Sequence, residues 1–169
     1  MKTSLVAVAV AVALALSGCA GYRVGDVKPH YLQDVHSIAV PMFKNNTYQP
    51  RVEGLVTNTV IKQFQQDGTF AIKGSDQADA VLEGVVTEIG RRPARSVRGN
   101  VLATTEFSLG VTVAYTLRKK GGGVVAGAPI TGTTSFFVGN DVNSDERQAI
   151  PIAVEDLAVR LVSQISEGW

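Results

Sequence analysis

The pattern of apolar and polar residues is most regular between Thr105 and Arg118. Apolar side chains occupy alternate positions there, and small or polar side chains fill the positions between them. The apolar residues are Phe107, Leu109, Val111, Val113, Tyr115 and Leu117. A period of two predicts a β-strand that buries one face. The other face carries Ser108, Thr112 and Thr116, so we expect a sheet that is open on that side, where these three residues contact a partner.

Two segments have apolar residues spaced three and four positions apart, which is typical of amphipathic helices. The first is Arg51–Gln66, and Asp67-Gly68 ends it. The second runs from near Asp145 to Glu167. Pro151 lies inside the second segment and marks either a kink or the true start of the helix, because proline lacks the backbone N–H. Each predicted helix thus has one apolar stripe with which to cover a sheet.

Apolar composition and flanking turn residues predict further strands at His36–Phe43, Thr69–Lys73, Ala78–Gly90 and Val124–Val138. Ala78–Gly90 is apolar on both faces, so we place it near the centre of the sheet. The glycines after Lys119-Lys120 form a hairpin turn. The order β-α-β-β-β-β-α predicts an α+β fold, a two-layer sandwich in which two amphipathic helices cover one face of a mixed four- to five-stranded sheet.

The N-terminal segment has the features of a secretory signal peptide. Lys2 precedes an unbroken run of Leu, Val and Ala at Leu5–Leu16. A helix of this length spans about 18 Å, which is too short for a bilayer core of about 30 Å. We therefore exclude the run from the fold and predict that it is removed.

The end of this run, Leu16-Ser17-Gly18-Cys19, resembles the bacterial lipobox. The resemblance implies cleavage between Gly18 and Cys19 and lipidation of the Cys19 thiol. Acyl chains would tether the protein stably without a membrane-spanning helix. The residue after the cysteine is Ala20 rather than aspartate, which resembles the pattern of lipoproteins sorted to the outer membrane. We therefore expect a lipid-anchored protein at the outer membrane, on its periplasmic face. The predicted organisation is a signal peptide (1–18), a lipidated N-terminus and spacer (19–35) and a single domain (36–169).

Composition and charge narrow the possible functions. The chain has 169 residues, of which 45% are hydrophobic and 18% are charged. Removal of residues 1–18 takes away Lys2 and leaves 15 basic and 15 acidic residues. A neutral mature chain argues against a nucleic-acid partner. One cysteine excludes an intrachain disulfide and any multi-cysteine metal site.

The sequence contains no clear catalytic constellation. His30 and His36 have no neighbouring cysteine or clustered carboxylates, which argues against a metal site. No serine lies in a Gly-x-Ser-x-Gly motif, and the glycines at 121–123 lack the Lys-Ser or Lys-Thr of a phosphate-binding loop. We therefore expect a protein that is not an enzyme and that uses no cofactor.

Several blocks of sequence resemble the lipopolysaccharide-assembly lipoprotein family LptE. They are Ile38-Ala39-Val40-Pro41-Met42-Phe43 with Asn45 and Thr47, Ala78-Asp79-Ala80-Val81-Leu82-Glu83-Gly84, Thr104-Thr105-Glu106-Phe107, and Val154-Glu155-Asp156-Leu157-Ala158 with Leu161-Val162, behind Cys19 and Gly21-Tyr22. The resemblance implies a non-enzymatic subunit of the outer-membrane lipopolysaccharide translocon. Such a subunit is seated inside a large β-barrel partner, as a plug and an aid to assembly. The chain departs from the family pattern at Ala20, and at the glycine run with Val124-Val125.

Four arginines lie close together around Pro93, namely Arg91, Arg92, Arg95 and Arg98. Guanidinium groups bind phosphate oxygens bidentately, and the family resemblance makes the phosphates of lipid A a candidate ligand. Lys119 and Lys120 would extend this basic end if the long strands pair as a hairpin. The alternatives are a solvated loop and a contact with acidic residues of the barrel partner.

A second hypothesis keeps the lipoprotein and changes its role. The opening strand also resembles lipoproteins of the curli-secretion type, which oligomerise into their own outer-membrane channel. Such a channel needs long strands that alternate between apolar and polar residues. Only Thr105–Leu117 offers such a run, so the translocon subunit is the preferred interpretation.

Overall fold

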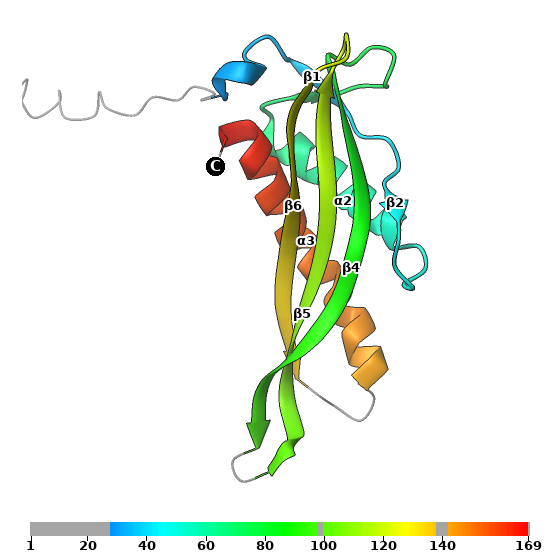
Figure 1. Cartoon of the computed structure of the whole chain (residues 1–169), viewed down its shortest axis with the longest axis vertical. Coiled ribbons are helices and arrows are strands. Elements are labelled where there is room, and N and C mark those ends of the chain that lie inside the picture. Colours follow the sequence, from blue (N-terminus) through cyan, green and yellow to red (C-terminus); the bar gives the residue numbers. More distant parts are fainter. Residues whose placement is uncertain (1–27, 98–99, 138–141, 169) are drawn as a thin grey trace, which may run out of the picture.

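The structure is a computed structural model that describes residues 28–97, 100–137 and 142–168. Figure 1 shows a long, curved sheet with two helices on one of its faces, which confirms the predicted α+β fold. The elements are η2 (His30–Leu32, a 3-10 helix), β1 (Ser37–Ala39), β2 (Lys44–Asn45), α2 (Val52–Asp67), β3 (Ala71–Ile72), β4 (Ala80–Val97), β5 (Asn100–Lys119), β6 (Val124–Phe137) and α3 (Val142–Glu167).

The described sheet is mixed and has six strands in the order β3-β1-β4-β5-β6, with β2 also paired to β4. Strands β1 and β2 run parallel to β4, whereas β4, β5 and β6 form antiparallel pairs. This exceeds the predicted four to five strands because His36–Phe43 is not one strand. The chain leaves the sheet around Pro41, which cannot donate to a strand ladder, and it pairs with β4 again at Lys44.

The predicted one-sided strand is confirmed in β5. Leu109, Val111, Val113 and Leu117 are completely buried, whereas Ser108, Thr112 and Thr116 on the other face are partly exposed. The apolar stripe of α3 joins the same core; it comprises Val154, Leu157, Ala158, Leu161, Val162 and Ile165. Strand β4 lies between β1 and β5, so its predicted central place in the sheet is also confirmed.

Helix α3 packs directly against the backbone of strand β6 at Gly132. A Cβ atom added there would lie 2.2 Å from the carbonyl oxygen of Ala153 and 2.3 Å from the backbone nitrogen of Leu157. Next to this contact, the backbone N–H of Thr133 donates to Asp156 Oδ2 at 2.9 Å. Helix α3 is therefore fixed to β6 by a contact that leaves no space for a side chain.

Strand β6 forms an edge of the sheet, and its free side is partly blocked. The N–H of Thr133 points away from β5, because it donates to Asp156 on α3. Pro129 lies four residues earlier with the same register parity, and it has no N–H to offer. Burial opposes ionisation of Asp156, but hydrogen bonds from Arg160 and from the Thr133 N–H outweigh it and lower the pKa of this carboxyl. Side chains and a proline thus limit the pairing of a further strand at this edge.

Three further boundaries differ from the expected ones by more than two residues. Strand β4 continues beyond Gly90 to Val97, and β5 already begins at Asn100, because the two strands pair along their whole length. The pairing is irregular near Pro93, where register shifts occur. Helix α3 begins at Val142, so Pro151 is neither its start nor close to it but lies inside the helix.

The turn between β5 and β6 is formed by the predicted glycines. Gly121 and Gly122 have φ angles of 106° and 113°, a region that residues with a Cβ rarely adopt.

Among the described residues, no helix is both long enough and apolar enough to cross a membrane.

A candidate functional site on the open face of the sheet

The uncovered face of the sheet contains a hollow of about 450 Å³. Strands β4, β5 and β6 form it, and none of its lining residues belongs to a described helix. Its lining consists of Glu88, Gly90, Arg91, Arg92, Ser108, Gly110, Thr112, Thr131 and Thr133. The structure therefore joins two groups of residues that the sequence analysis treated separately, the arginines and the small polar face.

The floor of the hollow is backbone. Gly90 of β4 pairs directly with Gly110 of β5, so two adjacent positions carry no side chain. Thr112 and Thr131 lie beside this pair, and their hydroxyl oxygens are 2.9 Å apart. A group that enters the hollow meets peptide groups and hydroxyls, which both donate and accept hydrogen bonds.

A bulge in β4 determines which charged side chains face this hollow. Val86 pairs with Val113 on the buried face, whereas Glu88 pairs with Thr112 on the open face, so Thr87 is an extra residue. An extra residue moves every later side chain of the strand to the opposite face. Arg92 consequently lies opposite Ser108 on the open face. Without the bulge, Arg91 would occupy this face instead.

Arg91 borders the hollow, but its charge is directed toward α3. The guanidinium forms an ion pair with Glu146 of α3, and it lies 5.5 Å from the centre of the Phe107 ring. Phe107 in turn stacks on Phe136, with ring centres 5.8 Å apart. Arg91 therefore links the far part of the hairpin to the helix layer. Of the four predicted arginines, Arg92 is the one whose exposed side chain the structure places on the open face.

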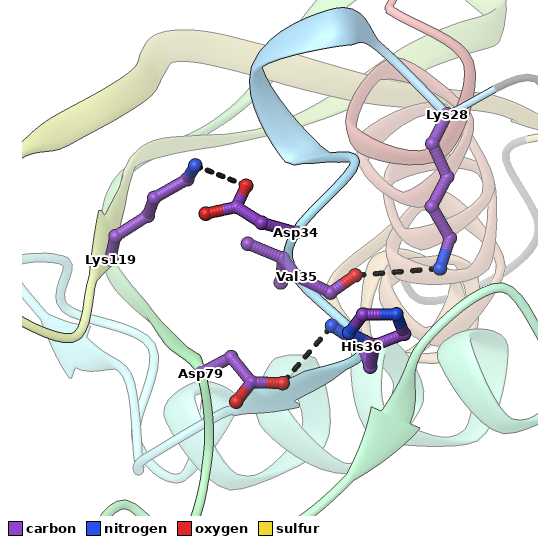
Figure 2. A network of polar contacts seen from close by, with 6 residues as sticks. All are labelled: Lys28, Asp34, Val35, His36, Asp79 and Lys119. Carbon is purple, nitrogen blue, oxygen red and sulfur yellow. Dashed lines mark hydrogen bonds and ion pairs between the residues drawn. The ribbon is translucent and has the colours of Figure 1, made fainter.

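Lys119 and Lys120 do not extend the arginine cluster, so this part of the prediction was wrong. The long strands do pair as a hairpin, but Lys119 lies opposite Ala80, at the start of β4. Lys119 lies eleven positions after Ser108 in β5, or about 36 Å away at the usual rise of a strand. Figure 2 shows Lys119 paired with Asp34, and Lys120 Nζ donates to the carbonyl oxygen of Asp76 at 2.8 Å.

The same end of the molecule contains a polar network that the sequence analysis did not find. Asp79 Oδ2 accepts the backbone N–H groups of His36 and Ser37 at 3.0 and 2.9 Å, and the Ser37 hydroxyl at 2.8 Å. Nearby, Lys28 Nζ donates to the carbonyl oxygen of Val35 at 3.4 Å (Figure 2). This network attaches the N-terminal part of the described chain to the beginning of β4.

The network predicts a loss of stability in acid. Hydrogen bonds from the Ser37 hydroxyl and the His36 N–H lower the pKa of Asp79 below its usual value of 3.8. This contribution is complete above the unfolded-state pKa and is lost as the pH falls through the lower folded-state pKa. We expect Asp79→Asn to be less stable than the wild type at pH 7, and the difference to shrink progressively as the pH falls below about 4.

Urea unfolding between pH 2 and 7 measures this effect. Asp76→Asn is a suitable control, since the carboxylate of Asp76 accepts no hydrogen bond within the described structure. A stability difference between wild type and Asp79→Asn that stays constant over this pH range would contradict the assignment.

Most of the remaining predicted site residues lie outside the described part of the chain. Gly18 and Cys19 are outside the described residues, as is Arg98, and the side chain of Arg95 is not described. Thr116 lies on the same face as Ser108 and Thr112, but it does not line the hollow.

In the described ranges, no three histidine, cysteine, aspartate or glutamate side chains are grouped to hold a metal ion.

Comparison with known proteins identifies a family whose model matches most of this chain. The family model described as LptE, lipopolysaccharide-assembly, matches residues 35–165. The match includes the whole hollow and most of the core. No curated protein matches the sequence.

Solved structures of small lipoproteins have a similar fold. A minor lipoprotein of Acinetobacter baumannii is 18% identical, with a TM-score of 0.54 over 80% of this chain and 95% of that one. A PelC dodecamer subunit of Paraburkholderia phytofirmans is 21% identical, with a TM-score of 0.53 over 82% and 93%. Lipoprotein B of Nitrosomonas europaea is 13% identical, with a TM-score of 0.53 over 87% and 88%. At these identities the likeness concerns the fold alone.

Proposed function

Since the chain belongs to the LptE family of lipopolysaccharide assembly, we propose that it is a lipid-anchored outer-membrane protein that acts with a large β-barrel partner to move lipopolysaccharide to the outer leaflet. In this proposal it has no enzymatic activity; it acts as a plug of the barrel and an aid to its assembly. The observation that carries the proposal is the hollow on the uncovered sheet face, where Arg92 lies beside a hydroxyl-lined floor.

The two ends of the molecule's long axis suit different roles in this proposal, membrane anchoring at one end and ligand or partner binding at the other. The described chain begins at Lys28, and Pro29 lies near Gly168 at the end of α3. The arginine-bearing end of the β4–β5 hairpin is at the opposite end of the molecule (Figure 1). The segment from Cys19 to Lys28 can extend to about 30 Å at most. An anchor at Cys19 would therefore leave the hollow and the hairpin end available to other molecules.

The chemistry of the hollow suits a phosphorylated saccharide. Arg92 can donate two parallel hydrogen bonds to a phosphate, and the hydroxyls of Ser108 and Thr112 can pair with sugar hydroxyls. Neither Glu88 nor Arg92 forms an ion pair with another described residue. A free guanidinium beside a hydroxyl-rich floor is available to a ligand, whereas that of Arg91 is held by Glu146.

Binding of purified protein to lipopolysaccharide tests this site. We expect Arg92→Ser to weaken binding about tenfold, because a charge-assisted hydrogen-bond pair is lost. Replacement of all four arginines by serine should weaken it further. Arg118→Ser is the matched control, since Arg118 is exposed at the other end of the hairpin, where it pairs with Glu83. Unchanged affinity in a folded Arg92→Ser variant would remove lipopolysaccharide as the ligand of the hollow.

A channel of the curli-secretion type is less compatible with the packing. Among the described strands, β5 has the regular alternating run, and its apolar residues from Leu109 to Leu117 are buried in the core that the helices share. A strand whose apolar face is buried in this way does not present that face to lipid. The fold likeness to a PelC dodecamer keeps self-assembly as the alternative outcome of a test for partners.

A further inference from the structure

Tyr48 is the most exposed of the large apolar side chains in the described structure. Its relative exposure is 106%, compared with 63% for Met42 and 41% for Tyr31. It lies in the loop between β2 and α2, which Figure 1 shows in cyan beside the sheet. Single exposed apolar residues are common on protein surfaces. This one differs because the loop that carries it is held in place from several sides.

Asn45 organises the loop. Its side-chain Nδ2 donates to the carbonyl oxygen of Gln49 at 2.8 Å and to Glu53 Oε2 at 2.9 Å. Its Oδ1 accepts the backbone N–H of Thr47 at 2.9 Å and the Thr47 hydroxyl at 2.8 Å. The amide of Asn45 thus uses both its donors and its acceptor to enclose the segment on which Tyr48 lies.

Two further features fix the loop. The backbone N–H of Asn46 donates to the carbonyl oxygen of Val86 at 2.9 Å, which attaches the loop to β4 two residues before Glu88 of the hollow. At its other end, Arg51 has a φ of 65°, the only positive φ of a non-glycine residue in the described ranges. Such a conformation is strained, and strain of this kind points to a functional constraint.

We propose that Tyr48 is a preorganised contact residue that inserts into an apolar pocket, rimmed by acidic residues, on a protein partner. Tyrosine and arginine are the residue types that most often dominate interface energies, and a rigid loop loses little entropy on binding. Lys44 and Arg51 flank the tyrosine in sequence and are exposed, and neither forms an ion pair with another described residue. The positive charges of these two residues would be complemented by acidic groups around the pocket of the partner.

A protein is the partner that these observations favour over a lipid surface. Membrane binding depends on the area of apolar surface inserted, and a fluid bilayer does not require a fixed position for one ring. A protein pocket does require it, and the loop is hydrogen-bonded to β4 at Val86, two residues before Glu88 of the hollow. The inference rests on the proposed function, in which the partner is the β-barrel of the translocon.

Co-purification of the full-length lipoprotein with its barrel from detergent-solubilised outer membranes tests this inference. We expect Tyr48→Ala to retain about 30-fold less barrel than the wild type, as truncation of an interface hot spot does. Asn45→Ala keeps the ring but frees the loop, and it should lose about fivefold. Tyr31→Ala, a second partly exposed tyrosine, is the matched control and should retain the barrel. Thermal melting establishes that each variant is folded.

The outcomes separate this inference from the proposed function. If the wild type retains the barrel and Tyr48→Ala retains as much, the inference is wrong and the proposed function stands. If the wild type retains no barrel, the proposed function fails and the inference fails with it. Binding to vesicles of phosphatidylethanolamine and phosphatidylglycerol is measured in parallel. A loss in Tyr48→Ala of vesicle binding alone would identify the residue as a membrane contact and overturn the inference.

Discussion

Gly132→Ala is expected to lower the free energy of unfolding by about 3 kcal/mol or more, with a fall of about 10 °C in Tm. The added Cβ would lie 2.2 Å from the oxygen of Ala153 and 2.3 Å from the nitrogen of Leu157, and both are backbone atoms. No change of rotamer relieves such a contact. Helix α3 would have to move away from β6, and the core contacts of Leu157 would be lost with it.

Thermal and urea unfolding measure this effect directly. Gly74→Ala is the matched control, because no atom lies within 4 Å of its added Cβ and its φ is not positive. We expect the control to unfold within about 0.5 kcal/mol of the wild type. Equal stability of Gly132→Ala and the wild type would show that the close packing of α3 on the sheet is wrong.

Cys19→Ser is expected to abolish incorporation of labelled palmitate and to reduce the protein in the outer-membrane fraction to background. The thiol is the atom to which the lipobox resemblance assigns the lipid, and a serine hydroxyl does not replace it. Each buried methylene of an acyl chain contributes about 0.8 kcal/mol to membrane binding, so the loss of several chains removes stable anchoring.

Ser17→Ala serves as the control, because it keeps a small residue before the cysteine. It should be labelled and fractionated like the wild type. If Cys19→Ser stays in the outer membrane at wild-type levels, the protein is held there by something other than a lipid on Cys19. The signal peptide and the lipobox are inferred from sequence alone, so this experiment tests them independently of the fold.

Much of the fold can be predicted from sequence because its strongest signals are local. The alternation in β5 identifies one buried and one open face, and the spacing of three and four residues identifies both helices. The part of strand β4 beyond Gly90 could not be predicted from such local signals. Arginines and Pro93 are typical of a loop, yet the segment is a strand because it pairs with β5. Pairing between distant segments is not a local signal.

The residues of the candidate site were predicted, but not their proximity, because proximity depends on pairing between distant segments. Arg92 and the pair Ser108 and Thr112 were both singled out, but as unrelated features. The bulge at Thr87 brings them to one face, and a single extra residue has no signature in the hydrophobic pattern. The predicted place of Lys119 beside the arginines is wrong because β4 and β5 are antiparallel, so the end of β5 lies beside the start of β4. The contact between Asp79 and Ser37 joins residues 42 positions apart, so no local sequence pattern indicates it.

Several polar residues of the segments that resemble the LptE family form hydrogen bonds that hold the backbone in place. Asn45 and Thr47 enclose the loop before α2, and Asp79 fixes the start of β1. Asp156 accepts the N–H of Thr133 and pairs with Arg160. These polar residues maintain the backbone of the fold rather than forming its hollow. Family resemblance therefore indicates the scaffold more directly than it indicates the ligand.

The most direct test of the proposed function is the composition of the complex formed by the full-length lipoprotein. The protein is purified from outer membranes in mild detergent, and its partners are identified by mass spectrometry together with the mass of the intact complex. The proposal predicts one copy of the lipoprotein with one large outer-membrane β-barrel protein. A ring of identical subunits without a barrel would contradict it and would support a channel of the curli-secretion type.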